Sequence, residues 1–451
     1  MPLPNDTADV IVIGAGLAGL KAAEDLVAAG RSVIVLEANG RVGGRLKRAE
    51  VAGEVADIGG QWIGKGHDEL LAQGARFGIA TYAQYESGKT VLQLLGRIAH
   101  FTGPVPKMPV LALIELGLLQ RRWQREMKTV PADAPWTAPR AEQWDSITLE
   151  SWISKNLRTA AAREFARLVP RGAWAAEARQ VSYLWFLDAL RSAGGLQYLM
   201  EVKGGALDCK LRGGMHQIAQ RMADALDDRV ILGAPVDKIV QDSNGVRVFT
   251  PKGGFSARFV IVAAPPAAAA RIAYEPRLPA ARDGLHQRMP AGAIVKIVVA
   301  YEKPFWRELG FSGQVATDDD LLGIVMDDTR DAGPGMLLCF IEGRHAVAMS
   351  PLRKDARRTM VLESLVRFFG PRAAYPLAYD DNDWLTEPHI HGYVGAMPPG
   401  TMTRFGHALR APCGRIHWAG SETAVEWAGY IEGALRSGIH AAREVAARHN
   451  E

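Results

Sequence analysis

The sequence predicts an α/β protein with two units, one built on a parallel sheet and one, of α+β type, that combines a mixed sheet with helices. Three observations support this prediction. Near the N-terminus an apolar strand pattern runs directly into a glycine-rich turn and a helix. Similar strand patterns return in the middle of the chain and near its end, and long, largely helical or mixed stretches separate them.

Length and composition are those of an ordinary globular protein. The chain has 451 residues, of which 48% are hydrophobic and 23% charged. This length suffices for two or more domain-sized units, and cores of this size need no disulfide or metal to hold them together.

The N-terminal segment predicts a βαβ unit. Val10–Ile13 is an all-apolar run of the kind found in buried parallel strands. Leu20–Ala29 has the spacing and composition of a helix, and Ser32–Leu36 reads as a second buried strand. Two such strands joined by a helix within about 30 residues form a parallel pair.

The turn between the first strand and the helix carries the pattern Gly14-Ala15-Gly16-x-x-Gly19. Gly14 allows a tight turn, Gly16 lets the backbone approach a pyrophosphate, and Gly19 lets the helix pack on the sheet. The free N–H groups of the helix N-terminus favour an anion there. The alternative is a glycine-rich turn without a ligand. The flanking elements favour a Rossmann-like dinucleotide site.

An acid and a second glycine-rich stretch follow the second strand. Glu37 stands at the strand end, where its carboxylate can accept both ribose hydroxyls and would repel the 2′-phosphate of NADP. Beyond it, Gly43 and Gly44 let the chain fold over a cofactor, while Arg41 or Arg45 can reach a diphosphate with paired donors. This extra stretch suits FAD better than NAD. The alternative is a flexible surface loop with solvated arginines.

The remaining segments predict further helices and strands. Helices are expected within Val110–Lys128, Trp152–Leu168, Val181–Arg191, Gly204–Ala225 and Gly429–Arg448. Leu111, Ile114 and Leu118 give the first of these an apolar side. Strands are expected at Val230–Leu232, Val236–Val240, Phe259–Ala263, Ile294–Tyr301 and Ile416–Ala419, with a hairpin turn at Ser243–Gly245.

Segments with the nucleotide-binding pattern lie at both ends and in the middle of the chain, so we expect discontinuous domains. Residues 1–80, 203–285 and 391–451 are predicted to form the cofactor domain, and residues 81–202 and 286–390 the substrate domain.

Charge and cysteine content exclude several classes of partner. The net charge is +4 with basic residues dispersed among acids, which does not indicate nucleic acid. Cys209, Cys339 and Cys413 lie far apart, as expected of reduced thiols in the cytoplasm.

The chain has no basic segment before an apolar run at its start, no run of 18 apolar residues and a polar end, so we expect neither a signal peptide nor a membrane anchor. His389 and His391 lack a third ligand, so no metal is expected. The sequence leaves a homodimer open.

Several motifs together resemble the flavin-containing amine oxidase family, of the monoamine oxidase type. They occur in the family's order, nearly from end to end. They are Gly14–Gly19, Glu37, Arg41–Arg45, Asp57–Trp62, Val181–Phe186 with Leu211–Gly214, Val295–Lys296 with Lys303–Trp306, and Gly420–Thr423 with Trp427–Gly433.

The resemblance implies a two-domain monoamine oxidase-like fold and FAD-dependent oxidation of a primary or secondary amine to an imine. Hydride would pass from the α-carbon of the amine to flavin N5, oxygen would be reduced to hydrogen peroxide, and water would hydrolyse the imine to an aldehyde or ketone. The partners would be a small amine and oxygen.

The resemblance also implies three catalytic residues. Lys296, the only charge in Ile294–Tyr301, would hold a water at flavin N5. An isolated lysine in an apolar strand is costly to bury without a partner, and the alternative is an ammonium that reaches solvent. Tyr393 and Tyr430 would face each other as an aromatic cage before the flavin.

Cofactor and substrate contacts follow from the same resemblance. Residues expected at FAD, besides the N-terminal glycines, Glu37 and the arginines, are Gly60, Gln61, Trp62, Val236, Trp384, Gly420, Ser421, Glu422 and Ile431. Some members link FAD through a cysteine before the cage tyrosine; here that residue is Gly392, so non-covalent FAD is expected. Small or apolar residues expected around the substrate are Gly172, Ala173, Met200, Leu207, Ala316 and Ile324, although ordinary core packing would explain them nearly as well.

Three other functions remain open. The first is an amine dehydrogenase of the same fold with an acceptor other than oxygen. The second is an L-amino-acid oxidase, disfavoured because Gln61–Gly64 lacks the arginine that clamps a carboxylate in those enzymes. The third is a flavin-binding module without activity, disfavoured because binding FAD requires neither Lys296 nor Tyr430.

Overall fold

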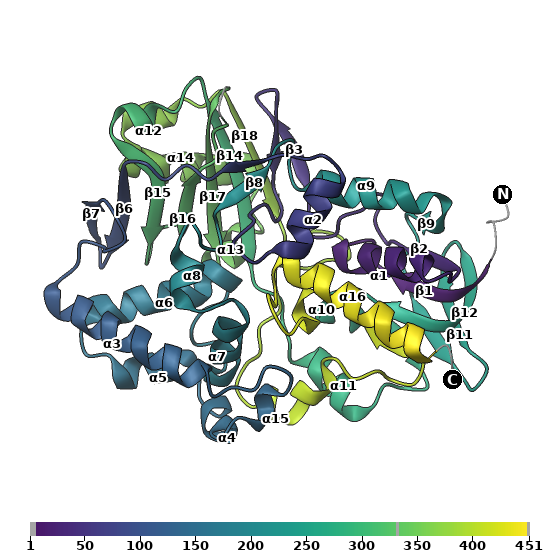
Figure 1. Cartoon of the computed structure of the whole chain (residues 1–451). Coiled ribbons are helices and arrows are strands. Elements are labelled where there is room, and N and C mark those ends of the chain that lie inside the picture. Colours follow the sequence, from purple (N-terminus) through teal and green to yellow (C-terminus); the bar gives the residue numbers. More distant parts are fainter. Residues whose placement is uncertain (1–5, 331–332, 449–451) are drawn as a thin grey trace.

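The computed structural model describes residues 6–330 and 333–448, which form two large sheets with helices around them (Figure 1). Part of the expectation about the chain ends rests on residues 1–5 and 449–451, which lie outside this description. Within the described residues, no helix combines the length and the apolar character needed to cross a bilayer.

The first sheet contains the predicted βαβ unit. Its strands, in spatial order, are β13 (Ala273–Glu275), β10 (Lys238–Gln241), β11 (Val246–Thr250), β12 (Gly253–Val262), β1 (Thr7–Ile13), β2 (Val33–Leu36) and β9 (Val230–Ile231), with β19 (Ile416–Trp418) also paired to β12. β1 lies parallel to β2 and β12, with Val12 beside both Val35 and Ile261. These central strands are buried on both faces, which explains why they read as unbroken apolar runs.

Three helices cover one face of this sheet and bring the two ends of the chain together. They are α1 (Leu17–Ala28), α9 (His216–Leu226) and α16 (Ile431–Arg448). α1 and α16 lie side by side in Figure 1. They approach so closely that a Cβ at Gly438 would lie 2.3 Å from the carbonyl oxygen of Ala18. The N-terminal and C-terminal segments therefore form one layer.

The first sheet is not purely parallel, because β11 runs antiparallel to β10 and β12. The second sheet is also mixed, with β15 parallel to β6. Its strands, in spatial order, are β18 (Ala378–Asp383), β14 (Ile294–Tyr301), β17 (Gly335–Glu342), β16 (Ile324–Asp327), β15 (Phe311–Thr317), β6 (Lys89–Leu94) and β7 (Arg97–Phe101). One face packs on α13 (Arg344–Met349) and α14 (Lys354–Phe369). Because side chains alternate along β14, Val295 and Ile297 belong to that core, whereas Lys296 belongs to the opposite face.

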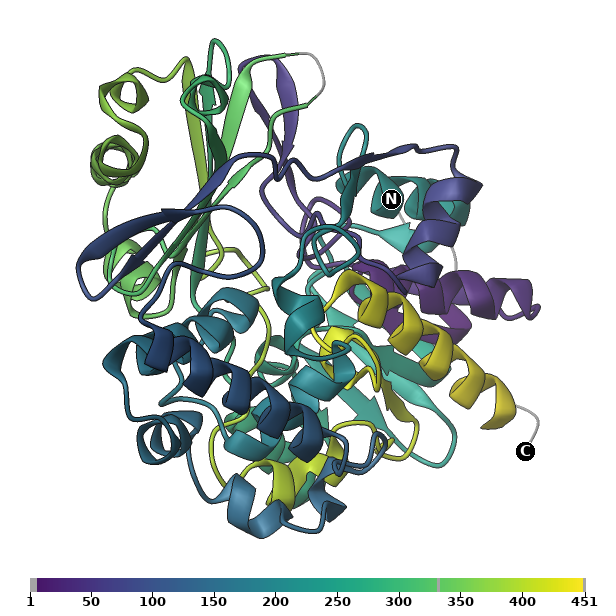
Figure 2. The same ribbon diagram turned by 60° about the vertical axis from the view of Figure 1, so that its left-hand side comes forward.

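A layer of helices completes the second unit (Figure 2). It contains α3 (Val110–Met127), α4 (Ala141–Asp145), α5 (Leu149–Asn156), α6 (Ala160–Trp174), α7 (Tyr183–Ser192) and α8 (Leu196–Met200). The single helix expected over Trp152–Leu168 is wrong, because α5 ends at Asn156 and a new helix begins at Ala160. The Thr159 hydroxyl accepts a hydrogen bond from the Ala162 N–H (3.3 Å) and so caps that helix.

The apolar side that the sequence indicates for α3 faces solvent. Leu111 and Ile114 are 69% and 54% exposed, and Leu118 is also exposed. The buried face instead carries Trp123, whose ring packs edge-on against Phe186 at 4.7 Å. A large aromatic side chain decides the orientation of this helix, although the smaller apolar residues give it a second stripe.

The remaining elements are short. The helices are α2 (Asp68–Arg76), α10 (Pro266–Ala269), α11 (Ala280–Gln287), α12 (Phe305–Glu308) and α15 (Met402–Phe405). The 3₁₀ helices are Pro135–Thr137, Asp227–Arg229, Pro371–Ala374, Gly406–Ala408 and Ser421–Thr423. Two small ladders pair β3 (Arg48–Val51) with β4 (Glu54–Asp57), and β5 (Thr81–Ala83) with β8 (Cys209–Leu211).

Gly19 tests the packing of α1 on the glycine turn. A Cβ at this position would lie 1.9 Å from the Gly14 carbonyl oxygen, so Gly19→Ala must push the helix away from the turn. We expect a loss of about 1–3 kcal/mol in the free energy of unfolding, measured by chemical denaturation. Gly117→Ala is the control, because nothing lies within 4 Å of its added Cβ in α3. A Gly19→Ala protein as stable as the control would contradict the close packing.

Candidate active site

One cavity of about 630 Å³ extends from the glycine turn to the second sheet and collects most of the predicted site residues. The predicted residues that line it are Gly14, Gly16, Glu37, Gly44, Arg45, Gly60, Gln61, Trp62, Gly172, Ala173, Met200, Leu207, Val236, Lys296, Ala316, Ile324, Trp384, Tyr393, Gly420, Ser421, Tyr430 and Ile431. Ala15, Gly19, Arg41 and Glu422 lie outside this lining.

The glycines at one end leave room for a ligand against the backbone. Gly14 and Gly44 have φ of +103° and +56°, conformations that favour glycine. A Cβ on Gly44 would lie 3.4 Å from the Cα of Gly16, so the two loops nearly touch. Gly16 precedes α1 without a side-chain cap, which leaves N–H groups of the first turn for an anion. This end fits the diphosphate of FAD.

Glu37 holds the glycine turn to the loop after β2. Its buried carboxylate accepts hydrogen bonds from the Ala15 N–H (2.7 Å) and from the backbone and side-chain N–H groups of Asn39 (2.8 and 3.0 Å). A carboxylate has about four acceptor positions, so these bonds leave capacity for a ribose hydroxyl.

The two arginines after Glu37 have protein partners. Arg45 forms a paired contact with Glu422 (2.7 and 2.9 Å) and also donates to the carbonyl of Tyr393 (3.0 Å). Burial alone would raise the pKa of Glu422, but Arg45 holds that pKa below its usual value. Arg41 donates to the carbonyl of Leu46 (2.9 Å), contacts Glu387 (3.4 Å) and does not line the cavity. The Arg45–Glu422 pair therefore ties the N-terminal loop to the C-terminal segment.

Lys296 is buried, so its ammonium does not reach solvent. It is 3% exposed, and Nζ donates to the carbonyl of Gly59 (2.6 Å) and to the side-chain oxygen of Gln61. Burial lowers the pKa of Lys296 to about 8, although the nearby Asp57 and Asp328 carboxylates act to raise it. A buried cation with two fixed acceptors is thus presented at the cavity wall.

Tyr393 and Tyr430 line the same cavity from different segments. Tyr393 follows Gly392, where an added Cβ would lie 2.6 Å from the Cβ of Ala291. A cysteine at position 392 would not fit without rearrangement, which agrees with non-covalent FAD. Tyr430 contacts the edge of His67, with 5.7 Å between ring centroids. Burial lowers the pKa of His67 to about 4, so a neutral ring supports this tyrosine.

The cavity-facing side of the second sheet carries two of the predicted substrate residues, Ala316 and Ile324, in one row with Phe340 and Lys296. Ala316 pairs with Ile324, Ile324 with Phe340, and Phe340 with Lys296. Residues in register on neighbouring strands share one face, which explains why positions so distant in sequence meet here. Gly172 and Ala173 of α6 close the opposite side.

Sequence reasoning missed Phe340, Glu342, Arg171 and His67. Glu342 follows Phe340 by two residues and lies on the same face of β17. It is 4% exposed, and its Oε2 has no hydrogen-bond partner among the described residues. Burial raises its pKa to about 8 even though Arg171 acts to lower it. The only sequence signal for Glu342 was its position as a lone acid at the end of an apolar strand. No sequence signal pointed to His67.

Comparisons with known proteins agree with this geometry. The family described as flavin containing amine oxidoreductase matches residues 17–446. A protein of Mycobacterium tuberculosis named as flavin-containing monoamine oxidase AofH is 41% identical over 446 residues, 98% of each chain. Flavin-containing amine oxidase A of Equus caballus is 36% identical over 448 residues, 97% of this chain and 84% of the relative.

Two solved structures have the same fold. Putrescine oxidase bound to putrescine aligns with a TM-score of 0.94 at 33% identity, over 99% of this chain and all of the other. Cyclohexylamine oxidase from Brevibacterium oxydans IH-35A aligns with a TM-score of 0.94 at 32% identity, with the same coverage. The chain belongs to the flavin-containing amine oxidoreductase family, and it is an FAD-dependent amine oxidase.

Proposed function

We propose that this protein oxidises small, largely apolar primary or secondary amines at the cavity end bordered by Lys296, Tyr393 and Tyr430, with oxygen as acceptor and hydrogen peroxide as product. The observation that carries this proposal is the continuity of the cavity, which joins the glycine cradle to a buried ammonium and two tyrosines.

The side chains around the cavity have distinct roles in this proposal. FAD, held at the glycine turn and beside Glu37, would supply the hydride acceptor for the amine α-carbon and the electrons for oxygen. Lys296 places a fixed positive charge, held by Gly59 and Gln61, where negative charge develops on reduction. Tyr393 and Tyr430 exclude water and orient the amine nitrogen, and their faces attract it in its cationic form as well.

The polar groups at the substrate side favour amines over amino acids. The guanidinium of Arg171 donates to the carbonyls of Thr317 and Asp318, the latter at 2.7 Å, so its paired donors are already engaged. Glu342 adds a carboxyl group that would repel a substrate carboxylate once ionised. The solved relatives include a putrescine oxidase and a cyclohexylamine oxidase, which supports small amines of differing shape.

The proposal extends to organisation and location. The strands of the first sheet all fall within residues 1–80, 203–285 and 391–451, and those of the second within 81–202 and 286–390, which supports the predicted domain division. All three cysteines are unpaired, as expected of a cytoplasmic protein. A dehydrogenase with another acceptor is the second candidate function, and the reoxidation rate distinguishes it.

An anaerobic amine panel tests the function directly. The FAD-loaded protein is mixed without oxygen with alkyl, aryl and alicyclic amines, and flavin absorbance is followed. We expect bleaching by at least one apolar amine and recovery of colour within seconds when oxygen is admitted. No bleaching by any amine would contradict the proposal, and bleaching with sluggish recovery would favour the dehydrogenase.

Replacing Lys296 tests its role with oxygen. Lys296→Met removes the buried charge, so we expect reoxidation of the reduced enzyme by oxygen to slow by about 10²–10³-fold, the usual cost of losing one preorganised electrostatic group. Reduction by amine should change far less. Stopped-flow absorbance measures both steps. Lys303→Met, which removes an exposed lysine, is the control, and a Lys296→Met enzyme that reoxidises like this control would exclude the role.

The burial of the Glu342 carboxyl group predicts how the free energy of unfolding depends on pH. Its folded-state pKa of about 8 exceeds the ordinary 4.5, so the folded state loses stability relative to the unfolded state as pH rises from about 4.5 to 8. At pH 8.5 we expect Glu342→Gln to be more stable than the wild type by about 1–3 kcal/mol, and at pH 4.5 equally stable. Thermal unfolding at both pH values measures this difference. An equal effect at both pH values would show that charge burial is not the cause.

A further inference from the structure

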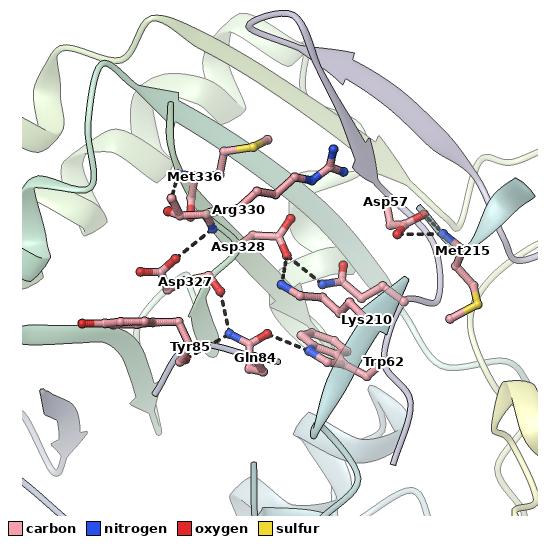
Figure 3. A network of polar contacts seen from close by, with 12 residues as sticks. Asp57, Trp62, Gln84, Tyr85, Lys210, Met215, Asp327, Asp328, Arg330 and Met336 are labelled. Atoms are coloured by element: carbon pink, nitrogen blue, oxygen red, sulfur yellow. Dashed lines mark hydrogen bonds and ion pairs between the residues drawn. The ribbon is translucent and has the colours of Figure 1, made fainter. Parts of the chain in front are cut away.

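A buried polar cluster extends from Lys296 and Gln61 at the cavity wall to Asp328 and Lys210, which lie outside the cavity lining. The side-chain nitrogen of Gln61 donates to Asp328 Oδ1 (2.9 Å), and Lys210 Nζ contacts the same oxygen at 2.5 Å. Figure 3 shows Lys210 and Asp328 converging on this point. The order of contacts is therefore Lys296, Gln61, Asp328, Lys210, with one carboxylate oxygen shared by the last two links.

The partners of Gln61 fix the orientation of its amide. Lys296 can only donate, and the Asp328 oxygen that faces Gln61 also accepts from Lys210, so the amide oxygen must face Lys296 and the amide nitrogen must face Asp328. If the amide turned over, both contacts would become unfavourable. The carboxylate of Asp328 thus decides which group Gln61 presents to the ammonium.

Asp328 and Lys210 are buried residues outside the cavity lining. Asp328 is 6% and Lys210 2% exposed, and neither lines the cavity, whereas Gln61 and Lys296 do. A buried ion pair contributes little net stability, since desolvation offsets the attraction between its charges. Stability alone gives no reason for a lysine and an aspartate in this place, whereas the contact of Asp328 with Gln61, and of Lys210 with the same Asp328 oxygen, gives one.

The charged groups around Lys296 come from several elements. Asp57, at the end of β4, accepts hydrogen bonds from the Met215 N–H (2.9 and 3.0 Å), and burial raises its pKa to about 6. Asp57 and Asp328 favour the charged form of Lys296, and Lys210 opposes it. The positive charge of Arg330 acts to lower the pKa of Asp57. The two members of the Asp328–Lys210 pair therefore have opposite effects on Lys296.

We propose that Asp328 and Lys210 are positioning residues for Lys296, which through the Gln61 amide hold its ammonium in place and set the pH range over which it stays charged. This inference rests on the role of Lys296 in the proposed function. It assigns a purpose to a buried ion pair that lies outside the cavity lining.

Asp328 and Lys210 act in opposite directions on the pKa of Lys296, and this difference can be tested in the FAD-loaded enzyme. The rate of reoxidation by oxygen should fall as pH rises through the pKa of Lys296, with a wild-type midpoint near pH 8. Asp328→Asn removes a favourable charge and should move the midpoint down by about one pH unit, while Lys210→Met should move it up by a similar amount. The double variant should return towards the wild-type midpoint.

A second readout does not depend on turnover. The absorption spectrum of the dithionite-reduced enzyme distinguishes anionic from neutral reduced flavin. An ammonium nearby favours the anion, so at pH 7.5 Asp328→Asn should contain more of the neutral form than Lys210→Met. Asp327→Asn is the matched control, because Asp327 is the adjacent buried acid but pairs with Arg307 (2.7 Å) and Trp306 (2.8 Å). It should leave the midpoint unchanged.

The outcomes separate this inference from the proposed function. If Lys296→Met slows reoxidation but Asp328→Asn and Lys210→Met leave the midpoint unmoved, or shift it in one direction, the pair is merely structural and the inference fails. If Lys296→Met itself reoxidises normally, the proposed role of Lys296 fails and the inference with it. Should Asp328→Asn not retain FAD, Gln61→Leu, which breaks the link but leaves the ion pair, must lower the midpoint instead.

Discussion

The fold is organised around the burial of one ammonium group. Lys296 lies within an apolar strand of the second sheet, where an unpartnered charge would be unstable. Its acceptors, the carbonyl of Gly59 and the side chain of Gln61, belong to the loop after β4. The charge is satisfied only when that loop docks on the second sheet. One side chain therefore joins the second sheet to the loop that carries Gly59 and Gln61, and it lines the cavity.

Other contacts between distant segments help to assemble the same cavity. Arg45 and Glu422 join the N-terminal glycine loop to the C-terminal segment, and α1 packs tightly on α16. These contacts bring the glycine cradle, the tyrosines and the buried lysine to one cavity. The aromatic and aliphatic walls lower the polarity of the surroundings, which strengthens each electrostatic interaction inside. Binding, orientation and charge stabilisation thus depend on a shared set of contacts.

Local patterns predicted much of this arrangement. The buried strands of the first sheet, the glycine turn and β14 follow from unbroken apolar runs and turn residues, and family motifs located Lys296 and Tyr430. Long-range choices could not be derived. Arg45 could pair with a diphosphate or with a carboxylate of the protein. The partner it has in the structure, Glu422, is distant in sequence, and only the fold brings it within reach. Glu342 is part of no motif that would have marked it. The orientation of α3 could not be predicted because it depends on the packing of Trp123 against Phe186.

A crystal structure of the FAD complex tests the central claim most directly. The account predicts the diphosphate at the N-terminus of α1 beside Gly16 and Gly44, with the flavin ring at the end bordered by Tyr393, Tyr430 and Lys296. The ammonium of Lys296 should still contact Gly59 and Gln61. A bound flavin whose ring lies away from Lys296, or a Lys296 side chain turned to solvent in the complex, would contradict it.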